Sequence, residues 1–328
     1  MSTPPLRRIA IIGAGAMGAS LAAITAPHVP TILVVRNEAR AERIRRHGVV
    51  VEGKLEAAGH PEVVGSIDDL ADIHPIDLVF IATKTTSIPE VCAAMAPHVR
   101  DLPYLVSYQN GIEPAQTIMD TLGTPRVVRM VLTYGATIVD ADDAAEGPSA
   151  EPLGIEVGVH QPPHDVGGIG SDARAFAQVL AYRLSAMGLP TEFADDIDAA
   201  VWRKGLLNAA SNPIAALVQA PLGELMASPA EPLMERLLDE GMAVAAAVGI
   251  ELGDGFRARA LEMMRAGSTH LPSMAEDVIH GRATEITQLN VQVAEHGLEM
   301  GVPTPTHDAV IALIETFDWR LGRTVPVR

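Results

Sequence analysis

The feature that most constrains this chain is the run IAIIGAGAMG at residues 9–18, in which four apolar residues lead directly into G-x-G-x-x-G. An apolar strand, three glycines at this spacing and an alanine-rich helical segment form the pattern of a dinucleotide-binding turn. In such a turn Gly13 allows the tight bend, Gly15 lets a pyrophosphate approach bare backbone, and Gly18 lets the helix pack closely on the strand. The chain is therefore predicted to begin with a Rossmann-type unit.

The next stretch indicates which dinucleotide is bound. The backbone N–H groups of Ala16 and Met17, in the first helical turn, are expected to face the phosphates. A second apolar stretch, residues 31–35, ends at Arg36, where an NAD-binding unit carries an acidic residue for the ribose hydroxyls. A cation at this position favours a 2′-phosphate, so we predict NADPH/NADP+ as the cofactor and Arg36 as its phosphate contact. The alternative is a surface arginine surrounded by water.

Strand and helix patterns alternate along the first part of the chain, as in a doubly wound α/β domain. Further strands are expected at residues 48–52, 77–82, 104–107, 127–132 and 189–193, and helices at 39–47 and 172–187. Residues 155–159 are expected to add a strand to the same sheet after a Pro/Gly/Asp-rich loop at 140–154. These patterns predict an N-terminal Rossmann-type NADP-binding domain over residues 1–193.

From residue 194 onward the pattern changes to long apolar helices with almost no strand signal. Helices are expected at residues 201–210, 233–248, 256–265, 283–300 and 308–320. The second domain, residues 194–328, is therefore predicted to be mostly α. The sequence has no uncharged apolar run of 18 residues, so no membrane-spanning helix is expected.

Composition narrows the classes of partner. Twenty-four basic and 41 acidic residues give a net charge of −17, which argues against a nucleic-acid or anionic-membrane surface. Cys92 is the only cysteine, which excludes an intrachain disulfide and a zinc-thiolate cluster, and the histidines show no H-E-x-x-H spacing. The sequence predicts no metal site, a small-molecule substrate and a reducing, cytoplasmic environment.

Two polar residues follow predicted strands of the first domain. Lys84 and Asn110 stand just past the strands at 77–82 and 104–107, at the sheet edge where ligands of open α/β folds bind. Lys84 could instead be a solvated loop lysine. Asn110-Gly111 could equally be a turn dipeptide that tolerates positive φ.

The second domain contains a polar stripe in an apolar helix. Lys204, Asn208 and Asn212 are spaced four residues apart, so a helix places one ammonium and two carboxamides on one face. Asparagine is a mediocre helix former and is costly to bury without partners, which favours a ligand-facing surface. The alternative is that the asparagines make structural hydrogen bonds and that Asn212 merely ends the helix before Pro213.

A second polar cluster follows at residues 272–286. Ser273 with Glu276 satisfies the pattern of a capping box, which is the structural alternative for both. Glu285 begins an apolar-periodic helix, where a carboxylate favours the positive end of the helix dipole. Neither residue would indicate a site alone.

Taken together these motifs resemble those of the ketopantoate reductase (2-dehydropantoate 2-reductase) family over nearly the whole chain. The matching motifs are GAGAMG, the arginine after the second strand, Lys84, Gln109-Asn110-Gly111, W-R-K-x-x-x-N-x-x-x-N-P from Trp202, S-M-x-x-D from Ser273 and R-x-T-E from Arg282. The resemblance implies an NADP-binding Rossmann domain followed by an all-α domain resembling the C-terminal domains of 6-phosphogluconate dehydrogenases. It also allows a homodimer.

The resemblance implies roles for individual residues. Lys204 would be the general acid and Glu285 would orient the substrate and the lysine. Asn208, Asn212 and Ser273 would bind the substrate, while Lys84 and Asn110 would face cofactor and substrate. These roles suit ketone reduction, because hydride transfer leaves negative charge on oxygen that an ammonium can stabilise and protonate.

The predicted function is NADPH-dependent reduction of ketopantoate to pantoate, a step toward pantothenate and coenzyme A. The alternatives are reduction of another 2-oxo acid and a non-catalytic NADP(H)-sensing module. The chain departs from the family pattern at Asn290-Val291, where Asn-Gly is frequent, at Pro305-Thr306-His307, where Pro-x-Asn is usual, at His270 and in the 140–154 loop. Because such positions flank the substrate region in the family, the departures bear on the substrate rather than on the reaction type.

Overall fold

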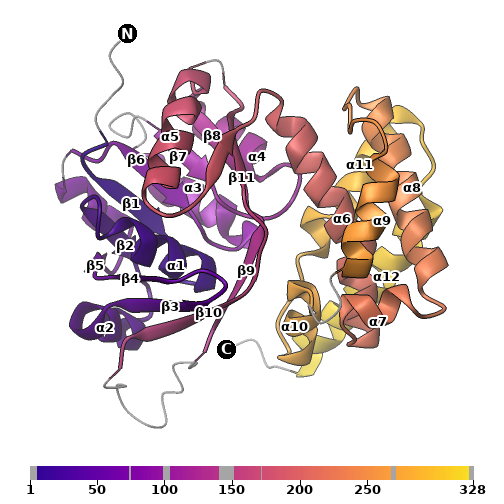
Figure 1. The fold of residues 1–328 in the computed structure, drawn as a ribbon, viewed down its shortest axis with the longest axis horizontal. Helices are drawn as coiled ribbons and strands as arrows, with labels where there is room; N and C mark the ends of the chain where they lie inside the picture. Colours follow the sequence, from indigo (N-terminus) through magenta and orange to yellow (C-terminus); the bar gives the residue numbers. More distant parts are fainter. Residues whose placement is uncertain are drawn as a thin grey trace. The chain divides into compact units, whose positions relative to one another are not determined.

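The computed structural model describes residues 6–73, 75–98, 104–139, 151–170, 172–266 and 271–324 (Figure 1). The chain divides into two compact units, of which the first comprises Met1–Gln109 and Pro114–Ile197 and the second Asn110–Glu113 and Asp198–Arg328. The short segment Asn110–Glu113 belongs to the second unit although the chain on both sides of it belongs to the first. The boundary between residues 193 and 194 stays a prediction about which parts fold independently.

The first unit is built on a sheet of eight strands in the order β12-β11-β8-β7-β6-β1-β2-β5. Neighbouring strands are parallel except at the junction of β8 and β11, which is antiparallel. Its strands are β1 (Ile9–Ile12), β2 (Thr31–Val34), β5 (Glu62–Val64), β6 (Leu78–Ile81), β7 (Tyr104–Ser107), β8 (Val127–Val131), β11 (His164–Gly168) and β12 (Thr191–Phe193). This sheet confirms the predicted Rossmann-type α/β fold.

The sheet is covered by helices on both faces, which explains why its central strands are apolar throughout. Successive strand residues point to opposite faces. Ile9 and Ile11 pack in a core that includes residues of α1 (Ala16–Thr25), α2 (Glu38–His47) and α5 (Arg174–Ala186). Ala10 and Ile12 pack in the other core, with residues of α3 (Ile88–Met95) and α4 (Pro114–Leu122).

The strand order indicates where on the sheet a ligand is expected to bind. From β1 the chain builds outward through β2 and β5 on one side and through β6, β7 and β8 on the other. Ligands of open α/β sheets bind beyond the carboxyl ends of the strands at such a reversal. The residues that follow β1 and β6, namely 13–15 and 82–84, therefore occupy the position where a dinucleotide is expected.

One expectation about the sheet was wrong. The strand expected at residues 155–159 is β10 (Leu153–His160), and it belongs to a separate four-stranded sheet in the order β4-β3-β10-β9. It pairs with β3 (Val49–Gly53) and β9 (Tyr134–Ile138), and β4 (Ala57–Gly59) pairs with β3. Alternate residues of β10 are buried, as in a strand covered on one face, whereas β1 and β6 are buried throughout. The expected loop at 140–154 falls largely outside the described residues.

The second unit is helical in its described part. Its helices are α6 (Ile197–Val218), α7 (Leu222–Met226), α8 (Glu231–Ala247), α9 (Phe256–Ala266), α10 (Ser273–Ile279), α11 (Asn290–Met300) and α12 (Pro305–Thr324), and the first residue of α6 still lies in the first unit. The helix expected at 283–300 begins only at Asn290, because a 3-10 turn, η3 (Ile286–Gln288), precedes it. No described helix is long and apolar enough to cross a membrane.

Helix α6 continues through Pro213, so the reading that Asn212 merely ends the helix before the proline was wrong. A proline lacks the N–H that would donate to the carbonyl four residues earlier, here that of Ala209. The side-chain Nδ2 of Asn290 donates to this carbonyl at 2.8 Å instead. The donor that α6 lacks is thus supplied by the first residue of α11.

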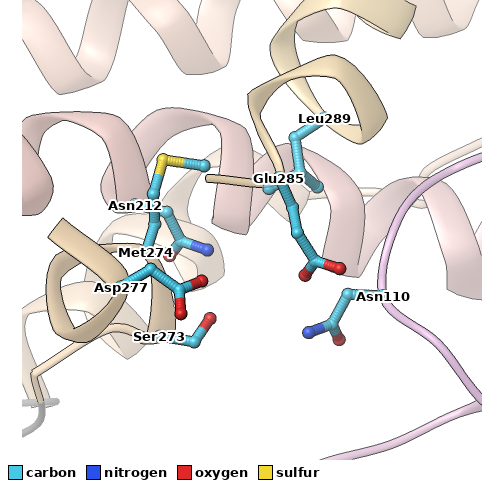
Figure 2. Close-up of a pocket in the computed structure, with 7 residues that line it drawn as sticks. All are labelled: Asn110, Asn212, Ser273, Met274, Asp277, Glu285 and Leu289. Carbon is cyan, nitrogen blue, oxygen red and sulfur yellow. The ribbon is translucent and has the colours of Figure 1, made fainter. Parts of the chain in front are cut away.

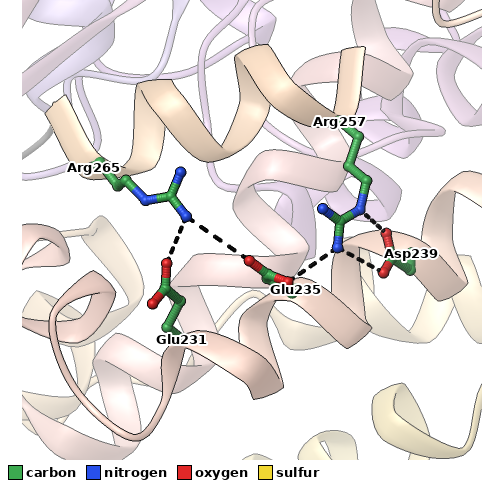
Figure 3. Close-up of polar contacts among 5 residues, drawn as sticks. All are labelled: Glu231, Glu235, Asp239, Arg257 and Arg265. Atoms are coloured by element: carbon green, nitrogen blue, oxygen red, sulfur yellow. Dashed lines mark hydrogen bonds and ion pairs between the residues drawn. The ribbon is translucent and has the colours of Figure 1, made fainter. Parts of the chain in front are cut away.

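Helices α8 and α9 are joined by a set of ion pairs (Figure 3). The guanidinium of Arg257 contacts both carboxylate oxygens of Asp239, at 2.6 and 3.0 Å, and Glu235 at 3.1 Å. Arg265, two turns further along α9, contacts Glu231 at 2.6 Å. Arg265 also lies 3.9 Å from Glu235, so the two arginines share this carboxylate. The bidentate contact and the shared carboxylate make this a network, which stabilises the packing of the two helices more than isolated surface pairs do.

Candidate active site

The turn after β1 has the geometry that a dinucleotide requires. Gly13 has a φ of +109°, and a Cβ there would lie 2.9 Å from the backbone nitrogen of Thr83. A Cβ on Gly18 would overlap the carbonyl oxygen of Gly13. At Gly15, by contrast, no described atom lies within 4 Å of the Cβ position. Two glycines are thus required by close packing, and the third borders the open space in which a pyrophosphate would lie.

Polar groups at this turn also suit a phosphate. Helix α1 begins at Ala16 with Gly15 as its N-cap and without a side-chain cap, so the first helical N–H groups, including that of Met17, are available to an anion. The hydroxyl oxygen of Thr83 is buried and has no hydrogen-bond partner among the described residues. The residues of the turn therefore fit the phosphates of NADPH. Sequence reasoning gave Thr83 no role, although its place directly after β6 was a usable signal.

Cationic side chains lie beyond the turn. Arg36 follows β2 and pairs with Glu90 at 3.0 Å, and both side chains are about two-thirds exposed, at 70% and 68%. An ion pair this exposed is weak, so the guanidinium can exchange its partner for a phosphate. Arg40 donates to the carbonyl of Ala14, inside the glycine turn, at 3.0 Å. Lys84 is exposed and precedes a 3-10 turn.

In the second unit, seven residues from separate segments surround one pocket (Figure 2). They are Asn110, Asn212, Ser273, Met274, Asp277, Glu285 and Leu289. Figure 2 shows the polar ends of Asn110 and Glu285 facing the same space as those of Ser273 and Asp277. The enclosed part measures about 10 Å³, roughly the space that one water needs, so a larger ligand would also occupy the open mouth.

Lys204 adjoins this pocket. Its ammonium donates to the carboxamide oxygen of Asn110 at 2.8 Å, which joins α6 to the segment Asn110–Glu113. Lys204, Asn208 and Asn212 all lie within α6 and share one face. Asn212 is buried and lines the pocket, whereas Asn208 is half-buried and is not among the seven lining residues. The structure therefore joins Lys204 to Asn110 by a hydrogen bond and places Asn212 with Asn110 at the pocket, whereas neither Lys204 nor Asn208 is a lining residue.

The structural alternative for Ser273 is wrong. Helix α10 begins at Ser273, its N-cap is Pro272, and no side-chain cap is present, so Ser273 and Glu276 do not form a capping box. Ser273 is exposed at the pocket instead. Asp277, one helical turn later, shares this face and lines the pocket, and its carboxylate accepts a hydrogen bond from Arg282 at 2.7 Å. Sequence reasoning assigned Asp277 no role, although its four-residue spacing from Ser273 was a signal.

Glu285 lies in an irregular segment and does not begin a helix as expected. It is the residue before η3 and is partly exposed. Its neighbour Thr284 is fixed by Asp318 of α12, which accepts from the backbone N–H of Thr284 at 3.1 Å and from its hydroxyl at 2.7 Å. The carboxylate of Glu285 is thus held at the pocket by its backbone environment rather than by a helix N-terminus.

Two of the departures from the family pattern lie in the core of the helical unit. Asn290 and His307 are fully buried, and Nδ2 of Asn290 lies 3.1 Å from Nδ1 of His307. Nε2 of His307 donates to the carbonyl of Leu237 at 2.9 Å. Burial lowers the pKa of His307, which keeps the ring neutral. Neither residue lines the pocket. His270 lies outside the described residues.

The described residues contain no group of three His, Cys, Asp or Glu side chains arranged to hold a metal ion. Cys92 is fully buried in the first unit, and burial raises the pKa of its thiol. The chemistry available at the pocket is therefore that of an ammonium, carboxylates, carboxamides and a hydroxyl. Such a set can bind a small polar anion and donate a proton to it.

Comparison with known proteins agrees with this arrangement. Residues 9–144 match the model of the family described as ketopantoate reductase PanE/ApbA, and residues 196–318 match that of the PanE/ApbA C-terminal domain. A 2-dehydropantoate 2-reductase of Pyrobaculum aerophilum is 30% identical over 223 residues, which cover 68% of this chain and 71% of that protein.

Two solved structures share the fold. A PanE/ApbA family ketopantoate reductase from Ralstonia eutropha JMP134 is 24% identical with a TM-score of 0.81, over 96% of this chain and 99% of that one. D-mandelate dehydrogenase with NADH and anilino(oxo)acetate is 23% identical with a TM-score of 0.79, over the same shares. The chain therefore belongs to the ketopantoate reductase family of NADPH-dependent oxidoreductases, which confirms the family, the class of enzyme and the cofactor predicted from the sequence.

Proposed function

We propose that the protein reduces ketopantoate to pantoate with NADPH, and that Lys204 is the proton donor. The observation that carries the proposal is the 2.8 Å hydrogen bond from the ammonium of Lys204 to Asn110, beside a pocket that Asn212, Ser273 and Glu285 also line. An ammonium anchored beside carboxamide and hydroxyl groups suits a small 2-oxo acid with a carboxylate and a hydroxyl.

Bound NADPH supplies the hydride, which is added to the carbonyl carbon of the acid. As the hydride arrives, the carbonyl oxygen becomes an alkoxide, and the ammonium of Lys204 stabilises that charge and transfers a proton to it. Lys204 then takes up a proton from water. Glu285 holds the ammonium and the substrate in place, while Asn110, Asn212 and Ser273 bind the carboxylate and hydroxyl groups of the acid. Asn208, one turn from Lys204, is assigned to the outer end of the substrate.

In the first unit we assign the phosphates of NADPH to the turn from Gly13 to Gly18 and to the hydroxyl of Thr83. The 2′-phosphate is assigned to Arg36, and Lys84 is placed at the cofactor from the end of β6. These assignments rest on the open space at Gly15 and on the exposed cation after β2. The one buried cysteine suits a reducing cytoplasm, and a homodimer is compatible with the family.

The first experiment is the loss of absorbance at 340 nm when enzyme, NADPH and ketopantoate are mixed, with NADH in parallel. Rapid turnover that is selective for NADPH is the expected result. A panel of other 2-oxo acids, including aromatic ones such as those related to mandelate, is measured beside it. If another acid had a far higher kcat/KM, that acid and not ketopantoate would be the substrate. Binding of NADPH without turnover of any acid would favour a sensing module.

A further inference from the structure

The segment Asn110–Glu113 is held within the helical unit by one buried side chain of α11. The side-chain oxygen of Gln292 accepts hydrogen bonds from two consecutive backbone N–H groups, that of Ile112 at 3.0 Å and that of Glu113 at 3.2 Å. Gln292 is only 6% exposed. Buried backbone N–H groups need an acceptor, and a single amide oxygen here serves two of them.

A second contact from the same helix supports the first. His296, one turn after Gln292 on α11, lies 2.8 Å from the carboxylate of Glu113 and also packs its ring against Trp202. The amide nitrogen of Gln292 faces the other oxygen of this carboxylate at 3.5 Å. Both contacts hold the segment just after Asn110 in place. Both come from residues that the motifs of the family do not include.

The anchored segment carries Asn110, which accepts the hydrogen bond from Lys204. Gly111, between Asn110 and the anchored residues, has a φ of +103°, a conformation that glycine adopts without strain but does not itself fix. The direction of the Asn110 side chain therefore depends on how firmly the next two residues are held. Gln292 supplies the holding contact.

We propose that Gln292 is a positioning residue: by holding the backbone of Ile112 and Glu113, it fixes the carboxamide of Asn110 against the ammonium of Lys204. The inference rests on the proposed function of Lys204 and Asn110. A displacement of about 1 Å at reacting groups can lower a rate about a hundredfold, so loss of this anchor is expected to lower kcat/KM by at least about tenfold.

The test replaces Gln292 by Met, which has a similar length but no strong acceptor, and by Asn, whose amide is drawn back by one methylene. Gln288→Met is the matched control, because the side chain of Gln288 contacts the amide nitrogen of Gln292 at 3.4 Å but makes no hydrogen bond to the segment within the described part of the chain. Thermal unfolding of each variant establishes that it is folded. If Gln292→Met fails to fold, Gln292→Asn is used for every measurement below.

The first measurement does not depend on activity. The side-chain amide signal of Asn110 in the ¹⁵N–¹H spectrum is identified by its loss in Asn110→Ala. It should shift or broaden in Gln292→Met and keep its position in Gln288→Met. An unmoved signal in both Gln292 variants overturns the inference, whichever acid the enzyme reduces.

The second measurement is a double-mutant cycle on kcat/KM with the best acid of the panel. If Gln292 acts through Asn110, Gln292→Met should lower kcat/KM by at least about tenfold in the native chain and have little effect in the Asn110→Ala background. Equal effects in both backgrounds would show a merely structural role and overturn the inference. Failure of the proposed function is seen separately, as a native enzyme that does not reduce ketopantoate.

Discussion

The ammonium of Lys204 donates a hydrogen bond of 2.8 Å to the carboxamide oxygen of Asn110, a residue 94 positions earlier in the chain. Lys204 lies within α6, whereas Asn110 comes shortly after β7 of the first unit but is grouped with the helical one. The bond places the charge of the lysine next to a residue that lines the polar pocket. A proton donor has to carry a proton that it can transfer, as the ammonium of a lysine does.

Lys204→Met is expected to lower kcat by roughly two to four orders of magnitude, because a positioned proton donor contributes about that much to a rate. Binding of NADPH should be retained. Stopped-flow measurement of a single turnover gives the rate of the chemical step directly. Lys54→Met, which removes the same charge from an exposed position, is the control and should turn over as the native chain does. Near-normal turnover of Lys204→Met would remove Lys204 from the mechanism.

Arg36→Asp is expected to weaken the binding of NADPH by about 10- to 100-fold relative to that of NADH, since a charge-assisted hydrogen bond to phosphate contributes about 1.5–3 kcal/mol. Glu90→Gln should strengthen the binding of NADPH slightly, because it removes the carboxylate that pairs with Arg36. The dissociation constants are measured by isothermal titration with each dinucleotide. Arg46→Asp makes the same charge change where the arginine pairs with Glu42 on α2. An unchanged preference in Arg36→Asp would assign the 2′-phosphate elsewhere, with Arg40 as the next candidate.

His307→Asn is expected to flatten the dependence of stability on pH. Burial lowers the pKa of His307 below the ordinary histidine value of about 6.5, so the unfolded chain binds a proton more readily than the folded one. The neutral ring contributes fully to the free energy of unfolding above about pH 6.5, and this contribution is lost as the pH falls through the lowered pKa of the folded state. Glu240 and Asp308 oppose the shift without reversing it.

Urea unfolding at pH 7.5, 6.0 and 5.0 measures this effect. The native chain should lose more unfolding free energy over this range than His307→Asn, which has no ionisable ring at this position. His28→Asn replaces an exposed histidine and serves as the control. Parallel pH profiles for the native chain and His307→Asn would contradict the prediction.

The sequence predicted those features that depend on local pattern. The glycine spacing predicted a turn whose open and crowded positions the structure reproduces at Gly15 and Gly18. The four-residue spacing of Lys204, Asn208 and Asn212 predicted a helical face, and α6 contains all three residues. Period and backbone sterics act over a few residues, so a single sequence reveals them.

Features that depend on distant partners could not be read in this way. The strand at Val49–Gly53 was recognised, but its pairing with Leu153–His160 joins segments about 100 residues apart. Gln292 and His296 looked like ordinary helical residues until the structure placed one on the backbone of Ile112 and the other at the carboxylate of Glu113. Nothing in the local sequence of α11 states what its polar residues contact.

The proline in α6 gives a further prediction, because Asn290 supplies the donor that Pro213 lacks. Asn290→Ala should lower the free energy of unfolding by about 1–3 kcal/mol, since the buried carbonyl of Ala209 then has no donor. In a Pro213→Ala background the backbone N–H of residue 213 can donate to that carbonyl. In this background Asn290→Ala should therefore lower the free energy of unfolding by clearly less. The remaining loss should reflect the missing contact with His307. Urea unfolding of the four chains measures the coupling, and an equal cost of Asn290→Ala in both backgrounds would show that Asn290 does not act through the carbonyl of Ala209.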